Sequence, residues 1–247
     1  MKKLIIVLLV FTSAFLGASE PVVIATTEWT AAFCRAAGLE EVTVLAPASL
    51  QHPPDYELKP SDIALLDEAD IIVFAGYEAM VDRISRHVAR SDVEMLQITT
   101  RYVPRVLEES ILKIAEAAGT TEIADRNIAK IREAWSEARN LVDSAVSADI
   151  RVAVHFHQVP FAKTVGLNQV IEFGPAPPGP RLIGEAAGSG ARLILDNWHN
   201  SISAPFREVL PEASVAELIN FPGRGGTVTL DDVILYNAGQ VAAALKN

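Results

Sequence analysis

The chain contains one cysteine in 247 residues, Cys34. A single cysteine excludes any disulfide within the chain, so a disulfide-stapled scaffold is excluded and stability must come from packing. Half of the residues are hydrophobic. That share and this length are sufficient for one large domain or two modest ones.

Basic residues are scarce relative to acidic ones. The sequence has 21 Lys and Arg against 31 Asp and Glu, a formal charge of −10. Removal of Lys2 and Lys3 with an N-terminal signal would make it −12. Such a balance argues against binding nucleic acid or anionic lipid through a broad electrostatic patch. It does not oppose the binding of cations.

The sequence also lacks a long apolar run. The longest extends from Leu4 to about Leu16, shorter than the roughly 20 residues of a membrane span. Two lysines precede it and small residues ending at Ala18 follow it, the layout of a secretory signal. We therefore expect residues 1–18 to be a signal peptide and the mature protein to be periplasmic or at the cell surface. An uncleaved anchor is the alternative; no cysteine stands at the cleavage point to support a lipid linkage.

From Pro21 onward, short apolar runs alternate with helical stretches, which predicts parallel sheets covered on both faces. Buried strands are expected at 22–25, 42–46, 71–76, 93–98, 151–155, 169–173, 192–196 and 214–219. Helices are expected at 29–37, 61–69, 77–90, 159–165, 180–188, 203–209 and 230–245.

The middle of the chain shows no strand signal. A stripe of apolar residues every three to five positions predicts one long helix over 121–147, about 40 Å in length. We therefore expect an α/β fold of two parallel-sheet lobes joined by a long backbone helix. The predicted boundaries are an N-terminal lobe at 19–107, linking helices at 108–148 and a C-terminal lobe at 149–247.

Four of the five histidines fall at the ends of predicted strands. His52 follows strand 42–46, His155 and His157 end the run "RVAVHFHQ", and His199 follows strand 192–196. Ligands of open parallel sheets collect at the carboxyl ends of the strands. Successive side chains of an extended chain point to opposite faces, so His155 and His157, two positions apart, would point to the same face. The four residues come from both lobes, which predicts a metal site between them.

Imidazoles suit zinc and other borderline cations, and Asp196 is a candidate oxygen ligand or a carboxylate that orients a histidine. The expected metal residues are His52, His155, His157, His199 and Asp196. Each histidine also has an interpretation in which it binds no metal. His52 would then be a polar loop residue, His199 would cap a strand, and His155 and His157 would be a surface or hydrogen-bonded pair.

Several motifs resemble the zinc- and manganese-binding solute receptors of ABC importers. They are "YELKPSDIALLDEADIIVFAGYE", "RVAVHFHQVPFAKTVGL", "FGPAPPGPRLIGEA", "LILDNW" and "LYNAGQVAAAL". The likeness covers nearly all of the mature chain. It implies two α/β lobes spanned by one rigid helix, and a receptor without catalytic activity.

The resemblance transfers only part of the family's ligand set. His155 matches a family ligand, whereas His52 lies two residues before the usual position, which falls on Pro54. The stretches "RYVPRVL" and "FPGRGG" lack the histidine and the carboxylate found there in the family, and the histidine-rich loop of zinc receptors is missing. His157 and His199 are the candidate replacements.

The expected function is capture of a divalent metal, Zn²⁺ first and Mn²⁺ second, by a monomer that delivers it to an ABC permease. One alternative keeps the fold but binds an organic or chelated-metal ligand of the siderophore or corrinoid type. A secreted metal-dependent hydrolase is another, although no His-Glu-x-x-His or Gly-x-Ser-x-Gly motif is present.

Overall fold

The computed structural model describes residues 20–47, 50, 52–89, 92–147 and 149–246. Its first sheet is parallel, with strand order β2-β1-β3-β4. The strands are β1 (Val23–Ala25), β2 (Val42–Val44), β3 (Ile71–Phe74) and β4 (Glu94–Gln97). The helices around this sheet are α1 (Glu28–Ala36), α2 (Pro60–Leu66), α3 (Val81–Val88) and α4 (Pro104–Ala118), with a 3-10 turn η1 (Pro53–Asp55).

A second parallel sheet follows, in the order β6-β5-β7-β8. Its strands are β5 (Arg151–His155), β6 (Asn168–Phe173), β7 (Leu193–Asn197) and β8 (Ser214–Leu218). The helices are α6 (Val159–Thr164), α7 (Pro180–Ala187), α8 (Ala204–Val209) and α9 (Leu230–Ala244), and the 3-10 turns are η2 (Phe156–Gln158) and η3 (Trp198–Asn200).

Alternate residues of the central strands belong to different cores. In β1, Val23 and Ala25 pack in the large core toward α1 and α4, whereas Ile24 packs in a second core with α2 and α3. In β5, Val152 and Val154 join the large core, and Ala153 faces α7 and α8. Burial on both faces explains why these strands read as continuous apolar runs.

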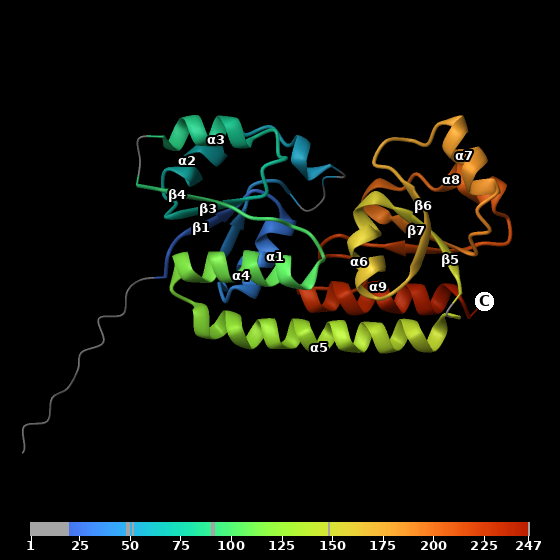
Figure 1. The fold of residues 1–247 in the computed structure, drawn as a ribbon. Helices are drawn as coiled ribbons and strands as arrows, with labels where there is room; N and C mark the ends of the chain where they lie inside the picture. Colours follow the sequence, from blue (N-terminus) through green and yellow to red (C-terminus); the bar gives the residue numbers. More distant parts are fainter. Residues whose placement is uncertain (1–19, 48–49, 51, 90–91, 148, 247) are drawn as a thin grey trace, which may run out of the picture.

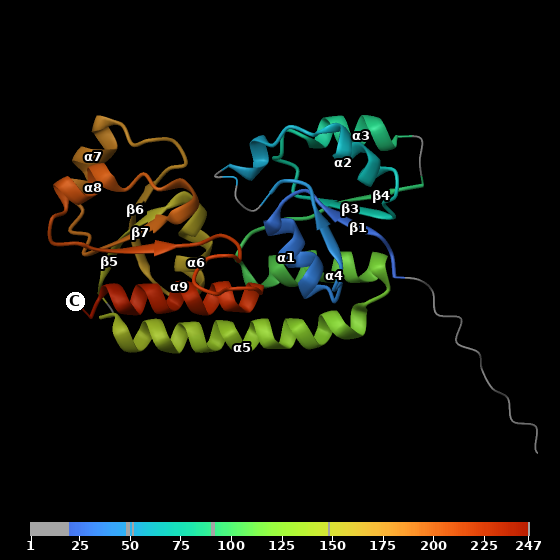
Figure 2. The same cartoon turned by 180° about the vertical axis from the view of Figure 1, so that it is seen from behind.

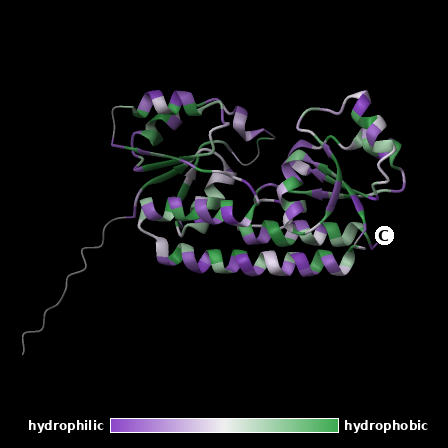
Figure 3. Ribbon diagram, in the orientation of Figure 1, coloured by the Kyte–Doolittle hydropathy of each residue, from purple (hydrophilic) through white to green (hydrophobic). Residues whose placement is uncertain are grey.

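The two lobes share the helix α5 (Thr121–Ala145), which runs beneath both of them (Figures 1 and 2). At 1.5 Å per residue, its 25 residues extend about 37 Å. Helix α9 lies along α5 under the second lobe. Hydrophobic and hydrophilic residues alternate along α5 (Figure 3). The hydrophobic residues form a buried stripe that includes Ile128, Ile131 and Trp135.

The expected α/β fold with two parallel-sheet lobes and a long backbone helix is confirmed, as is each predicted strand. The lobe boundaries at 19–107, 108–148 and 149–247 stay predictions. The expected signal peptide lies outside the described residues. No helix of the described part has the length and apolar character needed to cross a bilayer.

Candidate functional site

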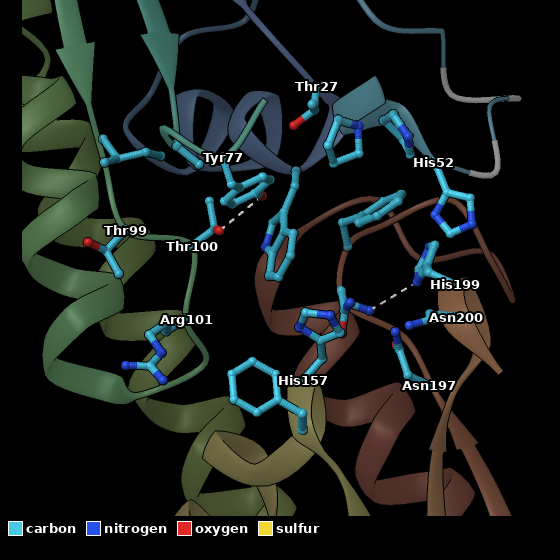
Figure 4. Close-up of a pocket in the computed structure, with 18 residues that line it drawn as sticks. Thr27, His52, Tyr77, Thr99, Thr100, Arg101, His157, Asn197, His199 and Asn200 are labelled. Carbon is cyan, nitrogen blue, oxygen red and sulfur yellow. Dashed lines mark hydrogen bonds between the residues drawn. The ribbon is translucent and has the colours of Figure 1, made fainter. Parts of the chain in front are cut away.

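A pocket of about 530 Å³ lies between the two lobes, at the carboxyl ends of their strands (Figure 4). Residues after β1, β2, β3 and β4 form one side, and residues after β5, β7 and β8 form the other. Both sheets therefore present their ligand-collecting edge to the same space, as parallel sheets do. The pocket lies where the sequence places its expected metal site, which stays a prediction.

The histidines that line the pocket are His52 from the first lobe and His157 and His199 from the second. His52 is exposed, and the other two are partly buried. Figure 4 shows His52 and His199 on the same side of the pocket although they come from opposite lobes. Three of the five residues expected to bind a metal therefore line the pocket, and their role as ligands stays a prediction.

His155 lies elsewhere, although it was expected to share a face with His157. Strand β5 ends at His155 and a 3-10 turn begins at Phe156, so the alternation of an extended chain stops between the two histidines. The rings of His155 and His157 stack with centroids 5.3 Å apart. His155 is fully buried beneath the pocket wall, and only His157 reaches the pocket.

The hydrogen bonding of His155 explains its role. Its Nδ1 accepts the backbone N–H of His157 at 3.2 Å, which stabilises the 3-10 turn and leaves the proton of a neutral ring on Nε2. That Nε2 faces Gly174, where a Cβ atom would lie 2.8 Å away. Burial, together with the nearby His157, lowers the pKa of His155 to about 4. His155 is therefore neutral in this arrangement, and its buried Nε2 has no hydrogen-bond partner among the described residues.

Asp196 is also outside the pocket wall. Its Oδ1 accepts the N–H groups of Asn197 at 2.9 Å and Ile202 at 3.4 Å. Its Oδ2 accepts the Ser201 hydroxyl at 2.6 Å and the Ser203 N–H at 3.3 Å. Both oxygens are thus used to hold the turn that follows β7, and the expected role as a ligand or a histidine-orienting carboxylate does not fit this geometry.

The imidazole of His199 packs on Phe221, with ring centroids 3.9 Å apart. Its Nδ1 accepts the Asn220 N–H at 3.4 Å, so the neutral ring carries its proton on Nε2 and binds a metal there only after a change of tautomer. Burial lowers the pKa of His199 to about 4, and the charges of Arg224 and His157 act in the same direction. Burial also lowers the pKa of His157. Neither ring is protonated near neutral pH.

The expected five-residue ligand set does not form one coordination shell. Within the described part of the chain, no three His, Cys, Asp or Glu side chains lie close enough together to hold a metal ion. His155 and Asp196 lie below the wall, and His52, His157 and His199, which line it, do not gather into a group of three. His52, His155, His157 and His199 stay predicted ligands.

The charge of the pocket wall is positive. Among the described residues, no Asp or Glu lines it, whereas Arg101 does. The nearby buried carboxylate of Glu78 is occupied by the Thr26 hydroxyl at 2.6 Å and by the N–H groups of Ala75 and Gly76. The wall therefore presents cationic and donor groups to a solute.

Several pocket residues were not identified from the sequence. Arg101, Asn197 and Phe221 line the pocket, and the sequence analysis did not single them out. Each of them follows or ends a strand, or begins the helix after one. Ligands collect at the carboxyl ends of parallel strands, and this argument, which was applied to the histidines, applies equally to these residues. Their positions in the sequence could therefore have identified them.

No protein-family model and no curated protein sequence matches the chain. Solved structures do match. The laminin-binding protein Lbp of Streptococcus pyogenes superimposes with a TM-score of 0.70 at 16% identity, over 92% of this chain and 100% of that one. A Mn-bound periplasmic metal binding protein from Candidatus Liberibacter asiaticus gives the same values. The solute-binding protein FpvC of Pseudomonas aeruginosa, in complex with Mn²⁺, gives 0.71 at 17% identity over 92% and 98%.

This chain has the fold of these binding proteins. The match extends over both lobes and the backbone helix, so the fold implied by the sequence motifs is confirmed. At this level of identity the comparison establishes the architecture and does not transfer ligands or partners.

Proposed function

We propose that this protein is an extracytoplasmic solute-binding protein that captures a divalent metal between its lobes and delivers it to an ABC permease. One observation carries the proposal: histidines from both lobes line a single pocket at the carboxyl ends of two parallel sheets. Structures with this fold were solved with manganese, nickel and cadmium. We propose that the protein acts as a monomer.

The composition of the pocket wall favours zinc. Neutral imidazoles are good ligands for zinc, whereas manganese favours carboxylate and other oxygen ligands. The described wall contains three histidines and no carboxylate. Zn²⁺ is therefore the first metal to test, and Mn²⁺ the second.

We propose binding without catalysis. A metal hydrolase needs a general base beside the metal-bound water. Asp196 is the one carboxylate among the expected metal residues, and its two oxygens hold the turn after β7 instead. The similar structures are named as binding proteins, which agrees with this proposal.

Calorimetric titration of zinc into the purified protein tests the proposal. We expect His157→Ala and His199→Ala each to weaken zinc binding by about tenfold or more, because each removes a candidate ligand. His87→Ala is the matched control: His87 lies on α3, bonded to Asp67 at 2.7 Å, and does not line the pocket. Equal affinity in all three variants and the parent protein would reject the site.

A further inference from the structure

We propose that the metal enters this pocket as a complex with a small, carboxylate-bearing organic chelator, and not as a bare ion. The inference rests on the proposed function, because it concerns the solute of the same pocket. Five features of the described residues support it: the size of the pocket, the spacing of its ligands, its charge, its unpaired donors, and its aromatic rings.

The size of the pocket exceeds what one ion requires. Its volume of about 530 Å³ lies in the range of sites for small organic molecules. A tetrahedral zinc site, by contrast, places four ligands about 2 Å from the metal. A bare ion would leave most of this space to water, whereas a chelate would occupy it.

The spacing of the protein ligands leaves a metal incompletely coordinated. The described His, Cys, Asp and Glu side chains do not gather in a group of three able to hold an ion. One or two imidazoles therefore reach the metal at a time, and zinc prefers four ligands. A chelator supplies the remaining ones from its own atoms.

The charge of the wall suits an anion. No described carboxylate faces the pocket, and the Arg101 side chain has no ion-pair partner among the residues that the structure describes. In Figure 4, Arg101 lies on the side of the pocket away from His52 and His199. A chelator carboxylate would neutralise the metal and pair with this guanidinium, a strong and directional contact.

Two buried donors in the wall also lack acceptors. The Asn197 side chain is 1% exposed, and its Nδ2 has no hydrogen-bond partner. Gln158 Nε2 donates to Asn197 Oδ1 at 3.1 Å and to Asn220 Oδ1 at 2.8 Å, which fixes the Asn197 amide with Nδ2 as the free end. Trp29 Nε1 is likewise buried and unpaired. Buried donors without acceptors are costly, so the pocket is suited to a solute rich in oxygen acceptors.

Aromatic rings provide a surface for the organic part of the solute. Trp29 lies 6.4 Å from Tyr77 and 6.1 Å from Phe221 between ring centroids, and all three line the pocket. Half of the Tyr77 surface is exposed. An aromatic surface of this kind adds nothing to the binding of a bare ion, but it contributes to the burial of an organic ligand.

Equilibrium dialysis with two labels tests the inference. The protein is dialysed against labelled zinc alone, labelled zinc with labelled citrate or nitrilotriacetate, and each labelled chelator alone. We expect zinc and a chelator to be retained together in equal amounts, and more tightly than zinc alone at the same free zinc concentration. Arg101→Gln should weaken retention of the complex by about tenfold or more, and Arg105→Gln should not.

Arg105 is a matched control because it lies on the exposed surface of α4, paired with Glu109 at 3.1 Å. Arg101 is exposed as well, so both variants should keep the parent melting temperature. Zinc retained equally with and without a co-retained chelator would overturn the inference and leave the proposed function standing. So would equal retention of the complex by both arginine variants, or joint retention of zinc with neither chelator. Failure to retain zinc in any form would overturn both proposals.

Discussion

The path of the backbone at Phe156 determines which of two neighbouring histidines faces the solute. In a continued strand, His155 and His157 would share one face. The 3-10 turn instead directs His157 to the pocket and buries His155, whose Nδ1 accepts the His157 N–H. His157 therefore lines the pocket, and His155 supports the turn from beneath it.

The buried His155 should make the metal-free protein less stable in acid. Its pKa is about 4 in the folded state against an ordinary 6.5, so between these values the unfolded chain binds a proton that the folded chain does not. The contribution of His155 to the free energy of unfolding is complete above pH 6.5 and is lost as the pH falls toward 4. Urea unfolding at about pH 7 and about pH 4.5 should show a loss of about 2–3 kcal/mol from this residue.

The variant His155→Gln isolates that contribution. Glutamine does not titrate, and its side-chain oxygen can accept the His157 N–H. The unfolding free energy of the variant should therefore change less between the two pH values than that of the parent protein. The same pH dependence in both proteins would show that His155 is not the titrating group.

Cys34 should be inert in the folded protein. It is fully buried on α1, and burial raises the pKa of its thiol to about 12. Because the thiolate is the reactive form, a thiol reagent at about pH 8 should modify Cys34 only after urea unfolding. Rapid labelling of the native protein would contradict this placement.

At the residue scale, the sequence predicted positions better than orientations. It located His52, His157 and His199 because each follows a strand whose apolar run is readable. It did not predict how His155 and Asp196 are hydrogen-bonded, because this depends on turn geometry and on residues two to seven positions later. A local turn interrupts the alternation of side chains in a strand, and the amino-acid composition gives little indication of where such a turn begins.

At the scale of elements, α5 connects the two lobes through one buried side chain in particular. Trp135 lies 6.5 Å from Tyr102 and 5.9 Å from Phe161, between ring centroids. Tyr102 precedes α4 and Phe161 belongs to α6, so the indole contacts residues of both lobes. The helix therefore forms part of a core that is shared by the whole chain.

Truncation of this tryptophan should destabilise the protein strongly. Trp135 is 2% exposed, and Trp135→Ala should lower the unfolding free energy by about 3–5 kcal/mol because it leaves a cavity between the lobes. Glu137→Ala, on the exposed face of α5, should change it by less than about 0.5 kcal/mol. Urea unfolding measures both values. A loss as small as that of the control would show that the indole does not join the two lobes.

The strands and helices themselves were predictable for a physical reason. Strands buried on both faces, such as Ile71–Phe74, are short unbroken apolar runs, and α5 carries a stripe of helical period. The 3-10 turns η1, η2 and η3 were not predicted, since three residues are too few for a periodic signal. These turns lie where the pocket histidines are placed.

At the scale of the molecule, one helix and one large core connect the lobes. A continuous cluster of buried residues includes side chains of both sheets and of α5 and α9. A stiff helix with a shared core should limit hinge motion compared with flexible strand linkers. Small-angle scattering of the solute-free and zinc-loaded protein should therefore give superimposable curves. A marked decrease in the radius of gyration on loading would indicate lobe closure instead.

The central claim is that a metal-containing solute binds between the lobes at the pocket histidines. Anomalous diffraction at the zinc edge, from crystals grown with zinc and a carboxylate chelator, tests it most directly. We predict one strong peak in the pocket within coordination distance, about 2 Å, of a nitrogen of His52, His157 or His199. A pocket without an anomalous peak, with zinc found only at surface positions such as His87 and Asp67, would contradict the account.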